Sequence, residues 1–316
     1  MLIASALVVI MTPIIAAIVI PLDLARGNRR LPLLRIHLFV CQYLLNDSLE
    51  ILAAGPLWVA AGFGSRLDQR ASQRRHQWIQ AWSIRVLARR AEQLLGVKIE
   101  LDPVDEAALA PGPAIALCRH VSLLDALIPP VLYLRVGIHT RGVIMAELLA
   151  DPGFDLLYQR AGSTFVPRDS CPSARAKAAV AARSLDDRSV AVIFPEGRLF
   201  RPDRLQHALT HIADRSPERV ARLAGLRHVL PPRPAGVLAL LDAAPTADLV
   251  IMSHVGLEGL SSIKELLRGV PLDTAVRVAA WRVTRDQIPD TDEGRIAWLD
   301  RTWCEVDRWL DERINA

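Results

Sequence analysis

The stretch GPAIALCRHVSLLD, residues 112–125, gives the clearest indication of the fold and carries the first candidate catalytic residues. Ile115 to Cys118 is a short apolar run, which predicts a buried strand. Ser122 is a good N-cap for a helix that follows. On an ideal α-helix an offset of five residues turns through about 140°, so His120 and Asp125 meet only if His120 precedes that helix and Asp125 lies in its first turn. The stretch therefore predicts a strand, a loop and a helix that bring a histidine beside a carboxylate.

Short apolar strands and helices alternate from this stretch to the end of the chain. Further strands are predicted over Val143 to Met145, Thr164 to Val166, Val190 to Phe194, Leu249 to Ser253 and Val276 to Ala280. Helices are predicted over Leu123 to Leu134, Pro172 to Ser184 and Arg295 to Ile314. Short apolar strands separated by helices favour a mostly parallel sheet covered on both faces. The predicted fold class is therefore α/β, with a mostly parallel sheet flanked by helices.

The start of the chain is apolar over a membrane-like length. No residue from Leu2 to Leu22 is charged, and a helix of this length spans roughly 31 Å, enough for a hydrocarbon core. We expect a retained membrane helix; a signal peptide or a buried core helix are the alternatives. A second apolar region, Leu31 to Phe63, is interrupted by the polar residues Asn46 to Glu50. It predicts a re-entrant or interfacial helical pair, followed by an amphipathic helix over Arg74 to Leu95.

The net charge of +4 comes mainly from arginine. One cluster (Arg26, Arg29 and Arg30) and a second (Arg66, Arg70, Arg74 and Arg75) lie beside the apolar segments, which suits an anionic lipid surface. For the second cluster a solvated charged face is an equal alternative. Nucleic acid is not an expected partner, because the basic residues are not interspersed with aromatic ones and no recognisable nucleic-acid-binding motif accompanies them.

The four cysteines show no paired spacing, which favours a reduced domain facing the cytosol. Cys118 lies two residues before His120 and invites a nucleophile interpretation, but the sequence favours a small apolar residue that fills a strand position. His207 and His211 share a helical face near Asp214, but no further ligand pattern supports a metal site. We therefore expect no metal.

A second motif, Phe194-Pro195-Glu196-Gly197-Arg198, ends a predicted buried strand. Proline stops the strand, Gly197 permits a tight turn with positive φ, and the backbone amides there can face an anion. Glu196 can bind hydroxyls or anchor an arginine. Arg168 follows another predicted strand, where it can grip a phosphate. Each feature also has an ordinary alternative explanation. Ser122 and Asp125 have the spacing of a helix-capping pair, Phe194 to Arg198 can be a simple turn between a strand and a helix, and Arg168 can form a surface salt bridge.

Taken together, these blocks resemble the signatures of the lysophospholipid acyltransferase superfamily, of the 1-acylglycerol-3-phosphate O-acyltransferase type. The blocks occur in the family's order as Arg119 to Asp125, Gly162 to Arg168, Phe194 to Arg198, and Leu230 to Gly236. A tryptophan-rich segment with Trp298, Trp303, Asp307 and Trp309 resembles the same branch. The similarity covers roughly residues 75 to 310.

The resemblance implies a glycerolipid acyltransferase fold in which His120 is the general base and Asp125 its partner. His120 would deprotonate an acceptor hydroxyl, which attacks the thioester of acyl-CoA or acyl carrier protein as co-substrate, without a cofactor or metal. The residues that would bind substrate are Ser122, Arg168, Glu196, Gly197, Arg198 and Arg233. Residues 1–63 would anchor the protein in the lipid bilayer. Residues 64–316 would form the acyltransferase domain, facing the cytoplasm.

The implied reaction converts a lysophospholipid, most simply lysophosphatidic acid, to the diacyl product. Three departures from the family's pattern bear on the acceptor: Arg119 replaces asparagine, Met145-Ala146 stand where a lysine is common before Glu147, and Arg198 replaces threonine. Acylation of another lysophospholipid or a glycolipid is therefore an alternative, as is a catalytically silent membrane scaffold. A hydrolase is disfavoured, because no Gly-x-Ser-x-Gly elbow is present.

Overall fold

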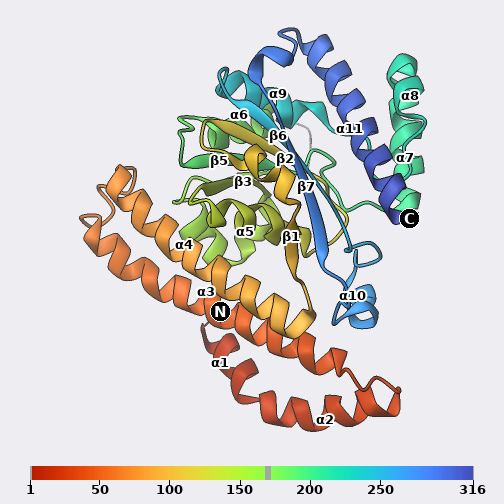
Figure 1. The fold of residues 1–316 in the computed structure, drawn as a ribbon. Coiled ribbons are helices and arrows are strands. Elements are labelled where there is room, and N and C mark those ends of the chain that lie inside the picture. Colours follow the sequence, from red (N-terminus) through yellow and green to blue (C-terminus); the bar gives the residue numbers. More distant parts are fainter. Residues whose placement is uncertain (1, 168–171, 316) are drawn as a thin grey trace. The chain divides into compact units, whose positions relative to one another are not determined.

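The structure, a computed structural model, describes residues 2–167 and 172–315. The chain divides into two compact units, coloured along the sequence in Figure 1. The helical unit comprises Met1–Lys98, Ala146–Ser163 and Ile263–Ala275. The sheet unit comprises Ile99–Met145, Thr164–Ser262 and Val276–Ala316.

The sheet unit is built on seven strands in the order β1-β7-β6-β2-β5-β3-β4. Their bounds are β1 Ile99–Leu101, β2 Ala114–Cys118, β3 His139–Met145, β4 Thr164–Val166, β5 Ser189–Ile193, β6 Asp248–Val255 and β7 Val276–Val283. Every neighbouring pair is parallel except β6 with β7. The prediction of a mostly parallel sheet is confirmed. The missed strand, β1, is three residues long and carries Glu100, so it lacks an apolar run.

Helices cover both faces of this sheet, which is why all five residues of β2 are buried. On one face lie α6 Pro172–Ala182, α9 Pro234–Ala243 and α11 Asp292–Ile314, with α7 Pro202–Ala213 and α8 Pro217–Leu223 beyond them (Figure 1). Leu117, Ile193 and Ile251 point into the core on this face, together with Leu240 and Trp303. The opposite face includes α5 Ile128–Arg135. The central strands β2, β5 and β6 therefore carry apolar runs.

The helical unit contains α1 Leu2–Ile10, α2 Thr12–Ala25, α3 Pro32–Ala60, α4 Arg70–Arg90 and α10 Ile263–Gly269. In the part of the chain that the structure describes, no single helix has both the length and the apolar character needed to cross a membrane. By length and composition alone, α1 and α2 meet those requirements as a pair bent by 54°. The predicted N-terminal helix is thus two shorter helices.

The second apolar region forms one helix, α3, so the prediction of a re-entrant or interfacial pair within it is wrong. Its polar residues do not break the helix because they bind other parts of the helical unit. Asn46 Nδ2 donates to the carbonyl and hydroxyl oxygens of Ser83 in α4, each at 3.1 Å. Asp47 Oδ1 accepts from the Gly153 amide at 2.9 Å, and the Tyr43 hydroxyl donates to Asp151.

The predicted amphipathic helix is α4, continued by a π-helical turn over Ala91–Leu95. Because α4 packs along α3, both helices belong to one compact unit. The predicted division of the chain into residues 1–63 and 64–316 stays a prediction.

We predict that replacing Glu50 with glutamine changes how the stability of the protein depends on pH. Burial raises the pKa of Glu50 to about 7 from an ordinary value of 4.5. A carboxyl with a raised folded-state pKa favours the folded state below its unfolded pKa, and this contribution is lost as pH rises from 4.5 to about 7. Glu50→Gln should therefore unfold at a higher temperature than wild type at pH 8, with little difference at pH 4.

Thermal unfolding at the two pH values measures this effect. Glu92→Gln is the control, because Glu92 is exposed and its replacement should leave the pH dependence unchanged. An identical pH dependence in Glu50→Gln and wild type would contradict the prediction.

Candidate active site

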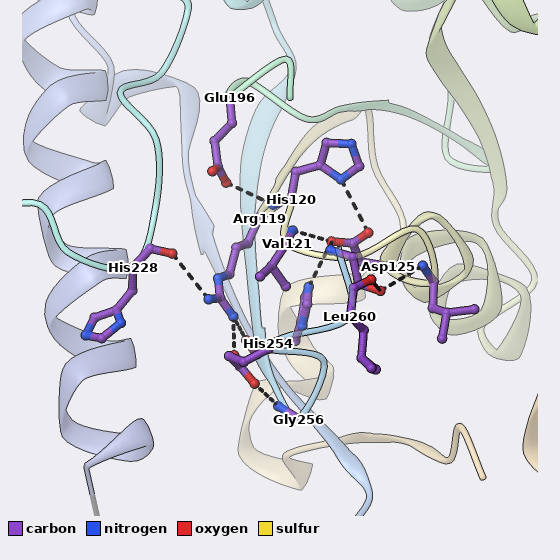
Figure 2. A network of polar contacts seen from close by, with 12 residues as sticks. Arg119, His120, Val121, Asp125, Glu196, His228, His254, Gly256 and Leu260 are labelled. Atoms are coloured by element: carbon purple, nitrogen blue, oxygen red, sulfur yellow. Dashed lines mark hydrogen bonds and ion pairs between the residues drawn. The ribbon is translucent and has the colours of Figure 1, made fainter. Parts of the chain in front are cut away.

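His120 and Asp125 face each other where the chain leaves β2 (Figure 2). His120 Nδ1 lies 3.3 Å from Asp125 Oδ1, the carboxylate is buried, and the imidazole is 21% exposed. Asp125 begins a short 3-10 turn, Asp125–Leu127, that leads into α5. The predicted juxtaposition is therefore present, with Nδ1 toward the carboxylate and Nε2 on the opposite side of the ring.

The second oxygen of Asp125 holds the loop itself. Oδ2 accepts from the amides of Val121 at 2.6 Å and Ser122 at 2.9 Å. Ser122 Oγ accepts from the Leu124 amide at 3.2 Å and donates to the Leu260 carbonyl at 3.0 Å. Oδ2 thus holds the turn and Oδ1 faces His120, but the prediction of Ser122 as a helix N-cap is wrong, because Leu124 precedes the 3-10 turn and Leu127 precedes α5. The α-helix begins later than predicted, at Ile128, where the prolines of the first turn need no hydrogen bond to their nitrogen.

The Phe194–Arg198 motif positions His120 from the neighbouring strand β5. Glu196 Oε1 accepts from the His120 amide at 2.9 Å, and the Phe200 amide donates to the His120 carbonyl at 2.7 Å. The Phe194 ring lies against the imidazole, with 4.5 Å between ring centroids. Both the backbone and the ring of His120 are therefore fixed by the motif that follows β5.

Glu196 also joins this motif to the fourth block. Its Oε2 accepts from the Leu230 amide at 2.8 Å, and the Arg233 amide donates to the Pro195 carbonyl at 2.7 Å. Gly197 adopts a positive φ of 66°, and a Cβ there would lie 3.1 Å from Arg233 Cδ. Burial raises the pKa of Glu196 to about 7, although its two backbone hydrogen bonds act in the opposite direction. The first, third and fourth sequence blocks are thus joined by hydrogen bonds into one assembly of loops around His120.

Residues predicted to bind substrate fall into two groups in this assembly. Ser122 and Glu196 are buried and their side-chain oxygens bind the protein's own backbone, so they shape the loops around His120. Arg198 and Arg233 are exposed on the loops beside Gly197. Arg168 lies outside the described residues. The assignment of substrate contacts to individual side chains stays a prediction.

Arg119, a departure from the family's asparagine, is a buried structural link. Its Nη1 donates to the His254 carbonyl at 2.6 Å and to Glu258 Oε1 at 2.5 Å, and its Nη2 donates to the His228 carbonyl at 3.2 Å. Burial raises the pKa of Glu258, but the charge of Arg119 outweighs burial and lowers it. Arg119 thus connects the ends of β2 and β6 to the loop before the fourth block.

The tryptophan-rich helix α11 holds the same loop from the other side. Asp307 accepts from the Arg227 amide at 3.0 Å and from the His228 amide at 2.6 Å. Trp303, one turn earlier, is fully buried in the core. The tryptophan-rich segment thus helps to position the loop that leads into the fourth sequence block, Leu230 to Gly236.

The charges around the dyad favour a basic imidazole. Burial alone lowers the pKa of His120, but the hydrogen bond and charge of Asp125, with the charge of Glu196, raise it above the ordinary 6.5. Burial raises the pKa of Asp125, yet the neighbouring imidazoles of His120 and His254 hold that pKa far below its usual range. The pair is therefore an ionised carboxylate beside an imidazole of raised proton affinity, which suits a general base.

His254 is the residue that the sequence reasoning missed. Its Nε2 lies 3.6 Å from Asp125 Oδ2, and both side chains are buried. The signal was a lone histidine just beyond the predicted end of the β6 strand. Cys118, by contrast, is a buried strand residue, and burial raises the pKa of its thiol, which disfavours the nucleophilic thiolate. Within the described residues no group of three or more His, Cys, Asp or Glu can hold a metal.

Comparison with known proteins agrees with this geometry. Residues 102–233 match the model of the Acyltransferase family, and the match spans the dyad, the Phe194–Arg198 motif and Arg233. The crystal structure of PlsC from Thermotoga maritima, a 1-acyl-sn-glycerophosphate (LPA) acyltransferase, superposes with a TM-score of 0.50 at 14% identity, covering 86% of this chain and 96% of that one. This likeness concerns the fold. No curated protein matches the chain.

A histidine that faces a buried carboxylate, at the end of a strand in a mostly parallel sheet, suits the chemistry of an acyltransferase domain. Residues 102–233 match the Acyltransferase family, which agrees with the acyltransferase resemblance of the four sequence blocks.

We predict that Asp125→Asn moves the acid limb of the rate profile to lower pH. The prediction takes His120 as the general base, which must be unprotonated to act, so that activity falls as pH drops through the pKa of His120. Asp125 raises that pKa, and an amide lacks the charge that does so. The variant should therefore lose its rate at a lower pH than wild type, and its plateau kcat/KM should fall because the imidazolium is less stabilised.

A pH series of kcat/KM at saturating co-substrate measures both effects. An acid limb that stays in place, or moves to higher pH, would contradict the role assigned to Asp125.

Proposed function

We propose that this protein transfers a fatty acyl group from acyl-CoA or acyl carrier protein to a lysophospholipid, with lysophosphatidic acid as acceptor and phosphatidic acid as product. The single observation that carries the proposal is the His120–Asp125 pair, fixed by the Phe194–Arg198 motif. The acyltransferase family match supports the reaction class. The donor is a co-substrate, and the chemistry requires no cofactor.

The proposed reaction uses His120 as a base. Nε2 of His120 takes the proton of the acceptor hydroxyl while the hydroxyl oxygen attacks the thioester carbonyl carbon. The carbon–sulfur bond then breaks, the ester forms, and the imidazolium returns the proton to the leaving thiolate. Asp125 stabilises the imidazolium through Nδ1 and fixes the tautomer that leaves Nε2 unprotonated at the start.

Exposed arginines support a phosphate-bearing acceptor. Arg198 and Arg233 lie on the two loops that Glu196 joins to His120. A guanidinium can bind two phosphate oxygens at once, so these side chains suit an anionic head group near the base. The absent lysine near Glu147 keeps another lysophospholipid or a glycolipid as the alternative acceptor. The intact dyad argues against a catalytically silent scaffold.

The proposal also places the protein on a membrane, with its catalytic domain in the cytoplasm. Large apolar side chains are exposed along α1 and α2, among them Ile3, Leu7, Ile10, Ile14 and Ile18. An open pocket of about 420 Å³ lies at the turn that follows α2. Among the residues that line it are Arg29 and Arg30 from this turn and Arg268 and Asp273 from the segment around α10. Arg30 binds both oxygens of Asp273 at 2.6 Å. Apolar helices that end at a cluster of arginines suit a bilayer with anionic head groups.

We predict that purified protein in lipid micelles converts lysophosphatidic acid and acyl-CoA to phosphatidic acid. His120→Ala should slow the reaction by about 10²- to 10⁴-fold, the usual contribution of a general base. Mass spectrometry of products from a panel of lysophospholipid and glycolipid acceptors identifies the substrate, with acyl-CoA and acyl carrier protein donors in parallel.

The panel separates the alternatives. A different acylated product would correct the acceptor, and wild-type rates in His120→Ala would refute the base. Absence of acyl transfer across all acceptors and both donors would favour the scaffold.

We predict that the triple variant Arg29→Gln, Arg30→Gln and Arg268→Gln binds anionic vesicles more weakly. Each basic residue near an anionic surface contributes about 1 kcal/mol, so the triple change should weaken binding by roughly a hundredfold. Co-sedimentation with vesicles of phosphatidylcholine and phosphatidylglycerol measures it. The control is a charge-matched triple of exposed arginines in the sheet unit, Arg188→Gln, Arg201→Gln and Arg301→Gln. Equal binding of both triples would contradict the assignment of this turn to the membrane.

A further inference from the structure

His254 stands on the opposite side of Asp125 from the proposed base (Figure 2). It lies near the end of β6, beside β2, where Met252 pairs with Cys118. Its Nε2 is 3.6 Å from Asp125 Oδ2, with the side chains of His254 and Asp125 exposed by only 2% and 1%. Among the described residues neither ring nitrogen of His254 has a hydrogen-bond partner.

A histidine in this position is costly unless it interacts with Asp125. Burying a polar group without a hydrogen bond is unfavourable, and a leucine or methionine would fill the same space without that cost. The neighbours on this face of β6 are apolar, including Val250 and Met252. The carboxylate of Asp125 is the anionic group that the structure places within reach of Nε2. Catalytic hydrogen bonds are often long without substrate and tighten in the complex, so a 3.6 Å separation is compatible with a bond that forms on binding.

The backbone of His254 is held in place independently of its ring. Arg119 Nη1 donates to the His254 carbonyl at 2.6 Å and also pairs with Glu258. Glu258 in turn accepts from the Gly256 amide at 2.7 Å. Arg119 also immediately precedes His120, so one residue links the backbone positions of the two histidines that face Asp125.

We propose that His254 is a positioning residue of the acyltransferase site, whose Nε2–H donates to Asp125 Oδ2 so that the carboxylate is held between two imidazoles. This interaction orients Oδ1 toward His120 and shares the negative charge of Asp125 between the two rings. The inference rests on the proposed function, because it assigns His254 to the same base. It adds a residue from β6, outside the four sequence blocks.

The charge sharing has a direction that can be measured. Besides Asp125, the groups near His254 are the Cys118 thiol on the same face of the sheet, whose pKa is raised by burial, and Arg119, which is bound to Glu258. Loss of the His254 donor would leave more negative charge on Oδ1, and His120 would then hold its proton more tightly. The acid limb of kcat/KM would therefore move to higher pH, opposite to its movement in Asp125→Asn.

Two substitutions distinguish this role from packing. His254→Leu removes the donor and should lower kcat by about tenfold to a hundredfold, the effect of one hydrogen bond to a charged group, and move the acid limb to higher pH. His254→Gln keeps an N–H donor at a similar distance from the backbone and should restore the wild-type limb with most of kcat. A rate loss in both variants without a shift of the limb, or wild-type behaviour in both, would overturn the proposal.

A measurement on the wild-type protein tests the same interaction without requiring that the variants fold. Imidazole ¹⁵N NMR should show His254 with its proton on Nε2; a neutral ring with its proton on Nδ1 would overturn the proposal, because it would aim a lone pair at the carboxylate. Failure of the proposed function is distinguishable, since wild-type protein would then transfer no acyl group, whereas failure of this inference leaves wild-type transfer and the His120→Ala loss intact.

Discussion

The buried carboxylate of Asp125 is the constraint on which the site depends. A carboxylate without partners costs several kcal/mol in a protein interior, so its charge must be compensated by hydrogen bonds. The amides of Val121 and Ser122 supply two of them, and His120 faces the other oxygen. The loop after β2 must therefore fold around Asp125, and that fold leaves Nε2 of His120 facing away from the carboxylate.

The remaining blocks support this loop through its backbone. Glu196 binds the amides of His120 and Leu230, and Arg119 and Asp307 fix the segment around His228 from two sides. These carboxylates and this guanidinium bind main-chain groups. Their role in holding the loops therefore does not depend on which lipid is the acceptor. In the proposed reaction, head-group recognition falls to exposed side chains such as Arg198, which make none of these contacts to the His120 loop.

Much of the sheet was predictable from sequence because its central strands are apolar on both faces. What sequence could not show depends on contacts between distant segments. Asn46 to Glu50 looked like an interruption of α3, but Asp47 binds Gly153, over a hundred residues away. β6 extends two residues beyond its predicted end, which left His254 outside the strand and unconnected to Asp125. Glu196 was expected to contact substrate, yet its partners are amides whose positions only the folded loops define.

The most direct test of this account is the proton affinity of His120 in the wild-type protein, followed by imidazole NMR across a pH titration. We predict a pKa for His120 above the ordinary 6.5, raised by Asp125 and coincident with the acid limb of kcat/KM. A pKa of His120 at or below 6.5, or one unrelated to the pH at which acyl transfer is lost, would contradict the central claim that this imidazole is the base.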